Sequence, residues 1–294
     1  QMAGWIDMGV TADAWTPTRW NSDGSVVPLD TVGGGSSAFS ASAEALNNHN
    51  QAAGYMWVTN SIHATRWEGT VVTDLGTLGG ATSFAYGIND AGQVVGSSYT
   101  ANDDASHATL WHGSDITDLG TLGGTNSEAY DINEAGQSVG WSQLSGDEIQ
   151  HAALWNGVDG DPVDLGGLTG AVSEFANGIN SSGQIVGGSF FADDSMKATL
   201  WENGQVIDLS SYLPDELVKE GWVFGPIEDI NDKGVMVGYA TNTIKGGYIG
   251  IMLTPAPVPV PAAFCLFGSA MFGVMGFKRF KHNQCINILS FKFS

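Results

Sequence analysis

Cysteine and basic side chains are the scarcest chemical groups in this chain of 294 residues. Both cysteines, Cys265 and Cys285, lie near its C-terminal end, which excludes a disulfide framework and a cysteine-based metal site from residues 1–253. Only ten residues are Lys or Arg, against 31 Asp or Glu, and the formal net charge is −21. Because nucleic acids and anionic lipid surfaces both attract positive protein faces, we expect no nucleic-acid partner.

The familiar catalytic motifs are also missing. The sequence has no G-x-S-x-G elbow, no H-E-x-x-H pair and no Walker loop. Its Gly-rich DLGTLGG segments lead into predicted strands and recur, so turn geometry explains them better than phosphate binding does. We therefore expect no catalytic residue, although the abundant carboxylates leave a glycosidase pair open as the alternative.

What the chain does contain is a repeat of 44 to 46 residues. The stretch Asp118–Trp155 opens with DLGTLGG and closes with HAALW, and Asp74–Trp111 and Asp164–Trp201 repeat it with small changes. Looser copies begin at Asp30 and Asp208. Self-similarity at such a period indicates a repeat architecture.

Each repeat predicts four short strands separated by tight turns. In the copy that begins at Asp118, the expected strands are 128–132, 137–142, 151–155 and 163–165. The Asn-x-x-Gly segment between the first two strands predicts a tight turn, because the Asn side chain hydrogen-bonds to nearby backbone and Gly adopts positive φ. The turn asparagines are Asn89, Asn133, Asn180 and Asn231. Four strands in about 40–50 residues is the size of one β-propeller blade.

The sequence therefore predicts an all-β fold, a β-propeller of four-stranded blades, over residues 1–253. The chain begins inside a repeat, because residues 1–4 align with the second strand of later copies. Either a segment has been removed or the sequence is a fragment. Counting the copies predicts about six blades, the N-terminal one incomplete, or seven if more is missing. A missing piece or strands shared between the two ends would close the ring.

One tryptophan per repeat is expected to anchor the packing between neighbouring blades, since a buried indole removes a large apolar area from water. These residues are Trp20, Trp67, Trp111, Trp155 and Trp201. A second aromatic position directly follows the Gly of the Gln-x-x-Gly segment, where rings could pack inside or stack on sugars. It is occupied by Trp5, Tyr55, Trp141 and Tyr239.

Two sets of side chains raise the question of a metal site. His63, His107 and His151 recur in register, but Lys197 and Thr16 take the same place elsewhere, so we expect structural or surface roles. Acidic pairs recur in the loops between the second and third strands and are weak calcium candidates. They are Asp103 with Asp104, Asp147 with Glu148, and Asp193 with Asp194. The competing interpretation is a solvated acidic surface.

The last repeat and the C-terminal segment depart from this pattern. Residues 210–223 predict one or two helical turns, as a terminal irregularity or a lid. Residues 254–261 predict a Pro-rich linker, residues 262–281 a short hydrophobic helix with a basic end, and residues 282–294 an atypical tail. The basic residues are Lys278, Arg279 and Lys281.

Two resemblances to known families rest on these motifs. The repeat, with its DLGTLGG, INxxGQxVG and HATLW segments, resembles the HAF repeat of bacterial proteins considered extracellular, and this implies a location rather than a chemistry. Residues 258–281 resemble the PEP-CTERM sorting signal, with Val258, Pro259 and Pro261 in its motif. This resemblance implies removal of the tail by an exosortase after transient membrane association. A retained single-span anchor is the alternative.

These patterns together predict a protein exported to the cell surface or the exopolysaccharide matrix of a Gram-negative bacterium. We expect a structural or ligand-binding role, with extracellular polysaccharide or surface proteins as partners and no cofactor unless calcium binds. The competing hypothesis is a propeller-based hydrolase or lyase that acts on extracellular polysaccharide. A third is a damaged fragment that cannot close its ring.

Overall fold

The computed structural model describes residues 2–7, 15–20, 25–29, 41–58, 60–69, 71–146, 149–158, 160–255 and 289–293. The predicted sorting motif at Val258, Pro259 and Pro261 lies outside the described residues, as do the hydrophobic helix 262–281 and its basic residues. Within the described residues, no helix is both long and apolar enough to cross a bilayer.

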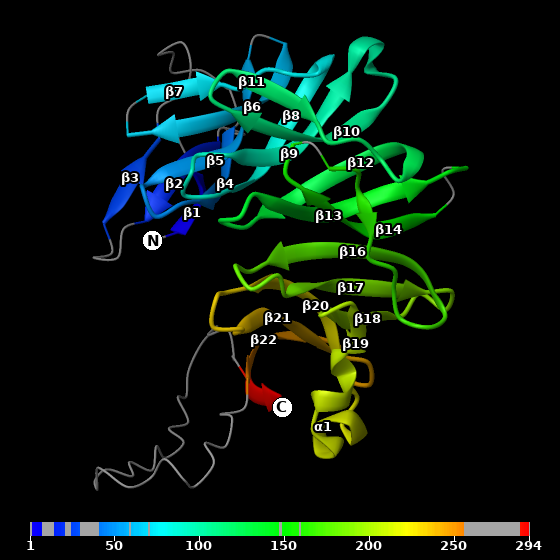
Figure 1. Ribbon diagram of the computed structural model, residues 1–294. Helices are drawn as coiled ribbons and strands as arrows, with labels where there is room; N and C mark the ends of the chain where they lie inside the picture. Colours follow the sequence, from blue (N-terminus) through cyan, green and yellow to red (C-terminus); the bar gives the residue numbers. More distant parts are fainter. Residues whose placement is uncertain are drawn as a thin grey trace, which may run out of the picture.

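The structure is all-β, and its strands form a series of sheets in chain order (Figure 1). The first sheet has three strands, β1 (Met2–Asp7), β2 (Trp15–Trp20) and β3 (Val26–Pro28). The second contains β4 (Ala41–Leu46), β5 (Gln51–Val58), β6 (Ser61–Glu68) and β7 (Val71–Asp74). The third contains β8 (Gly79–Ile88), β9 (Val94–Thr100), β10 (Ser106–His112) and β11 (Asp115–Asp118).

The fourth sheet contains β12 (Gly123–Ile132), β13 (Gln137–Leu144), β14 (Gln150–Asn156) and β15 (Val163–Asp164). The fifth contains β16 (Ala171–Ile179), β17 (Ile185–Phe191), β18 (Met196–Glu202) and β19 (Gln205–Asp208). All five of these sheets are antiparallel. The sixth contains β20 (Trp222–Ile230), β21 (Met236–Asn242), β22 (Tyr248–Pro255) and a parallel fourth strand, β23 (Leu289–Phe293).

The observed sheets confirm the four-stranded unit, because the strands expected in the copy at Asp118 correspond to β12, β13, β14 and β15. Each sheet packs against the next one along the chain. The first strands β4, β8, β12, β16 and β20 lie side by side, and together they form the first-strand edge of the array. This arrangement is consistent with propeller-like blades.

The repeated tryptophans lie in the layers between sheets. Trp111 is buried in a cluster with Ala53 and Ala64 of the preceding sheet and with Ile88 and Val94 of its own sheet. The other buried repeat tryptophans are Trp67, Trp155 and Trp201. Trp20 belongs to β2, and its side chain lies outside the described part of the chain. A large ring at this position excludes water from both sheets at once.

The asparagine turns link the sheets through a ladder of hydrogen bonds. Each turn Asn donates from Nδ2 to the backbone carbonyl of the turn Asn in the next sheet, at 2.9–3.1 Å. The ladder runs through Asn47, Asn89, Asn133, Asn180 and Asn231. Asn231 ends it and is exposed, because no described sheet packs beyond it. The ladder therefore adds a polar connection to each apolar layer from the second sheet to the sixth.

The insertion in the last repeat folds into two short helices. A 3₁₀ helix, Leu209–Tyr212, is followed by α1 (Asp215–Lys219), as the sequence predicts. Leu209 and Leu213 are buried against the sixth sheet, in a cluster with Phe224 and Ile227. Leu209 and Leu213 therefore attach the insertion to the array, whereas α1 itself has no buried residue and extends beyond the last sheet (Figure 1).

Candidate functional site

Every four-stranded sheet carries a β-bulge in its first strand, three residues before the turn asparagine. At each bulge one residue is passed over in the pairing with the second strand. The bulged residues are Glu44, Tyr86, Tyr130, Asn177 and Glu228. Bulges bend a strand and redirect a side chain, and they are frequent at functional sites. Here they recur along the first-strand edge.

Aromatic rings meet along this edge and form a continuous row. Tyr55 packs edge-to-face on Phe84, with ring centroids 5.1 Å apart, and Phe84 lies 6.3 Å from the parallel ring of Tyr86. Tyr86 packs edge-to-face on Tyr130 at 5.6 Å. Trp141 Nε1 then donates a hydrogen bond to Tyr130 Oη at 2.8 Å. The row joins three consecutive sheets, and its rings remain partly exposed.

At the end of this row the surface is hollowed into a cleft, which we call the aromatic cleft. Its volume is about 520 Å³. Its walls come from the fourth, fifth and sixth sheets and are lined by Tyr130, Trp141, Gln150, Phe175, Asn177, Phe190, Met196, Pro226, Glu228 and Tyr239. Five aromatic side chains and a few convergent polar groups are the usual composition of a small-molecule site.

Two carboxyl groups at this edge are held partly out of water. Burial raises the pKa of Glu128, and hydrogen bonds with Tyr130 and Trp141 oppose the increase. Burial also raises the pKa of Glu228, which lines the cleft. Burial raises the pKa of the Tyr130 phenol as well, helped by the charge of Glu128. The edge therefore combines aromatic faces with hydrogen-bond acceptors that bind protons more readily than exposed carboxylates do.

A neighbouring carboxylate links two first strands. Asp131 Oδ2 accepts a hydrogen bond from the Ile179 backbone N–H at 2.8 Å, across the boundary between the fourth and fifth sheets. Burial raises the pKa of Asp131 to about 6, with a further contribution from the charge of Asp229 and opposition from the backbone N–H of Ile179. Asp131 thus holds together the two sheets whose side chains meet in the cleft.

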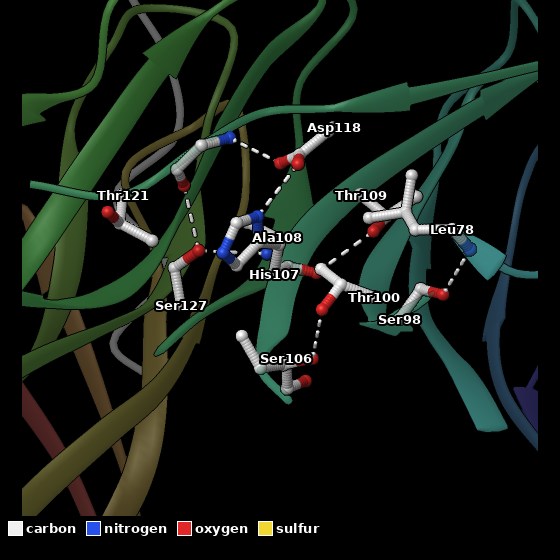
Figure 2. Close-up of polar contacts among 12 residues, drawn as sticks. Leu78, Ser98, Thr100, Ser106, His107, Ala108, Thr109, Asp118, Thr121 and Ser127 are labelled. Carbon is white, nitrogen blue, oxygen red and sulfur yellow. Dashed lines mark hydrogen bonds and ion pairs between the residues drawn. The ribbon is translucent and has the colours of Figure 1, made fainter. Parts of the chain in front are cut away.

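The recurring histidines have a structural partner that the sequence did not reveal. In four consecutive repeats the side chain at this position pairs with the Asp that begins the next repeat. The pairs are His63–Asp74, His107–Asp118, His151–Asp164 and Lys197–Asp208, at 2.7–2.9 Å. Figure 2 shows His107 pointing at Asp118, which also accepts the Gly120 N–H. The hydrogen bond to Asp118 raises the pKa of His107, against the opposite effect of burial.

The His151–Asp164 pair has a second carboxylate beside it, from Glu174. Other sheets have a serine at the position of Glu174. In the third and fourth sheets, Ser83 and Ser127 accept a backbone N–H and donate to a glycine carbonyl. Glu174 replaces this serine in the fifth sheet, and only 4% of its side chain is exposed. Its Oε2 has no hydrogen-bond partner and lies 3.6 Å from Nε2 of His151. Burial raises the pKa of Glu174, the charge of His151 lowers it and Asp164 raises it.

The calcium candidates lie in separate hairpins and are not brought together. Asp103 accepts the Ala81 N–H at 2.7 Å, and Asp193 accepts the N–H and hydroxyl of Ser195. Asp104 and Asp194 are exposed in the same hairpins, whereas Asp147 and Glu148 lie outside the described residues. Among the residues that the structure describes, no three His, Cys, Asp or Glu side chains are grouped closely enough to hold a metal ion.

Part of the aromatic edge follows from the sequence, and the rest does not. Tyr55, Trp141 and Tyr239, noted for their register, do lie at the first-strand edge, whereas the side chain of Trp5 is not described. The bulged positions were missed, although the third residue before each turn Asn is large or polar in every copy. No protein-family model and no curated protein matches the chain, so geometry carries the functional assignment.

Proposed function

We propose that the protein binds carbohydrate along its first-strand edge. The observation that carries this proposal is the aromatic cleft, where Trp141, Phe175 and Tyr239 surround Glu228 and Asn177. Flat aromatic faces suit the C–H faces of sugar rings, while carboxylate and amide groups bond their hydroxyls. A cavity volume of about 520 Å³ falls in the range of small-ligand sites.

The charge of the chain narrows the class of sugar. With a formal net charge of −21, the protein repels polyanionic polysaccharides at low ionic strength. Two bulged residues, Glu44 and Glu228, and the edge residue Glu128 add carboxyl groups. Neutral sugars and amino sugars are therefore the favoured ligands, and uronic-acid polymers are disfavoured.

A hydrolase or lyase that acts on polysaccharide is the second candidate. The observation in its favour is the raised pKa of Glu228 within the cleft, because a glycosidase needs a carboxylic acid that stays protonated near neutral pH. In that case Glu228→Gln abolishes the release of reducing ends but leaves polysaccharide binding intact. A binding protein releases no reducing ends with either side chain.

We further propose that the sheets close into a propeller of about six blades and that the protein is exported. Ring closure is supported by the recurring sheets and by the exposed last member of the asparagine ladder, Asn231. Export, processing by an exosortase-like enzyme and residence at the cell surface or in the exopolysaccharide matrix are supported by the sequence of residues 258–281. Mass spectrometry of the mature protein from an exosortase-bearing host tests the processing.

The binding proposal is tested with Trp141→Ala in affinity electrophoresis through neutral and amino-sugar polysaccharides. Loss of one stacking ring and of its hydrogen bond to Tyr130 is expected to weaken binding at least tenfold. Tyr248→Ala is the matched control, since Tyr248 is 80% exposed and does not line the aromatic cleft. Equal retardation of both variants and of the unaltered protein would contradict a carbohydrate site in this cleft.

A further inference from the structure

A second cavity of about 500 Å³ lies beside the aromatic cleft. It is bounded by the turn between β17 and β18, by the insertion that carries α1, and by β20 and β21. Its lining is largely apolar and includes Leu213, Val218, Trp222, Val223 and Phe224. We call it the insertion pocket.

The two cavities adjoin, because Met196 and Tyr239 line both of them. Tyr239 can take this place because Gly225 lacks a side chain: a Cβ at Gly225 would lie 2.4 Å from the Tyr239 ring. Gly225 lies in a register shift between Phe224 and Ile227, which the pairing of the first two strands in the third and fourth sheets does not have. A ligand seated on Tyr239 can therefore extend from one cavity into the other.

The charges at the insertion pocket argue against an anionic ligand. The ammonium group of Lys197, which lines the pocket, is paired with Asp208 at 2.7 Å. The other charged lining residue is Asp194, a carboxylate. A free fatty acid would therefore bring its carboxylate to a wall that offers no unpaired cation. A neutral hydrocarbon chain meets no such penalty.

Exposed apolar side chains at the rim of the insertion pocket also favour a hydrocarbon ligand. Val218 on α1 is 51% exposed and Val223 on β20 is 40% exposed, and both line the pocket. Covering them with hydrocarbon removes apolar area from water at about 25 cal/mol per Å². The insertion thus presents an apolar wall to the sugar site, which the repeats without an insertion do not have.

We propose that the insertion pocket binds an aliphatic acyl substituent of the carbohydrate held in the aromatic cleft. The ligand is then an acylated neutral or amino sugar, with its ring on Trp141 and Tyr239 and its chain against Val218 and Trp222. This inference rests on the proposed carbohydrate function and adds a substituent class to it.

The test is isothermal titration of the full chain with methyl, butyl and hexyl β-D-glucopyranosides below their micellar concentrations. Each added methylene is expected to strengthen binding two- to fourfold until the pocket is filled. Val218→Asp should weaken hexyl glucoside binding about tenfold and leave methyl glucoside binding unchanged. Val158→Asp is the matched control, because Val158 is 49% exposed and lines neither cavity.

The outcomes separate this inference from the function on which it rests. Equal affinities for methyl and hexyl glucoside, or no detectable binding of hexyl glucoside at millimolar concentration, overturn the acyl pocket. Chain-length dependence that is lost in Val218→Asp supports it. If Trp141→Ala leaves hexyl glucoside binding unchanged, the pocket holds hydrocarbon independently of the cleft, and the carbohydrate proposal fails instead.

Discussion

The same position in different repeats can hold side chains with different hydrogen bonding, and comparing the repeats shows which side chains are unusual. Ser83 and Ser127 each satisfy a buried backbone N–H and a glycine carbonyl. Glu174, at the same position, leaves a carboxylate oxygen buried and without a hydrogen bond. The serines of the third and fourth sheets therefore show which hydrogen bonds the fifth sheet lacks at Glu174.

The first prediction concerns this buried carboxylate. Glu174→Ser is expected to raise the free energy of unfolding by about 1 kcal/mol at pH 7, because it removes a buried charged group and restores the serine hydrogen bonds. Since the pKa of Glu174 is raised on folding, the unaltered protein gains stability as the pH falls from neutral toward 4.5, and the advantage of the variant shrinks there. Urea unfolding at pH 7 and pH 5 measures both effects.

A reciprocal variant controls for this result. Ser127→Glu places the same carboxylate in the fourth sheet, where it should lower the free energy of unfolding by about 1–3 kcal/mol. A Glu174→Ser protein that is less stable than the unaltered one at both pH values would show that the Glu174–His151 contact is favourable as it stands.

At the scale of strands and turns, much of the unit follows from the sequence, because turn chemistry and the repeat period are local signals. The Asn-x-x-Gly turns, the strand order and the register of Tyr55, Trp141 and Tyr239 all follow from it. The bulges at Tyr86 and Tyr130 do not, because a bulge is a property of pairing between two strands. The His107–Asp118 pair was missed for the same reason: its partners lie on adjacent strands.

The second prediction concerns the asparagine ladder between sheets. Asn133 donates to the Asn180 carbonyl at 3.1 Å and bonds Gln137 within its own turn. Asn133→Ala removes the bond to the Asn180 carbonyl and takes the side-chain acceptor from the Ala135 and Gln137 N–H groups, so we expect the free energy of unfolding to fall by about 2–4 kcal/mol. Thermal and urea unfolding of the purified protein measure the loss.

Asn231→Ala is the matched control for the turn itself. Asn231 accepts the N–H groups of Lys233 and Val235 but is exposed and precedes no described sheet. Its replacement should cost about 1 kcal/mol, the value of the local turn alone. Equal losses at Asn133 and Asn231 would mean that the bonds between sheets contribute nothing measurable to stability.

At the scale of the whole molecule, acidic residues greatly outnumber basic ones. The excess of carboxylates repels itself more strongly in the compact array than in the extended chain. The paired carboxylates, such as Asp118 and Asp208, are the exception, because each has a basic side chain, His107 or Lys197, at 2.7 Å. Screening should therefore favour the folded state overall, and it should affect these close pairs less than it affects the long-range repulsion.

The third prediction follows from this balance. Raising NaCl from 10 to 500 mM is expected to raise the melting temperature by several degrees, since the screening length falls from about 30 Å to a few ångströms. A melting temperature that falls with salt would show that the His–Asp and Lys–Asp pairs outweigh the repulsion.

CaCl₂ at equal ionic strength should cause no further, saturable increase in melting temperature, because Asp103 and Asp193 lie in separate hairpins and are already bonded within their own loops and strands. A saturable increase that disappears in Asp103→Asn or Asp193→Asn would instead place a calcium ion at these loops.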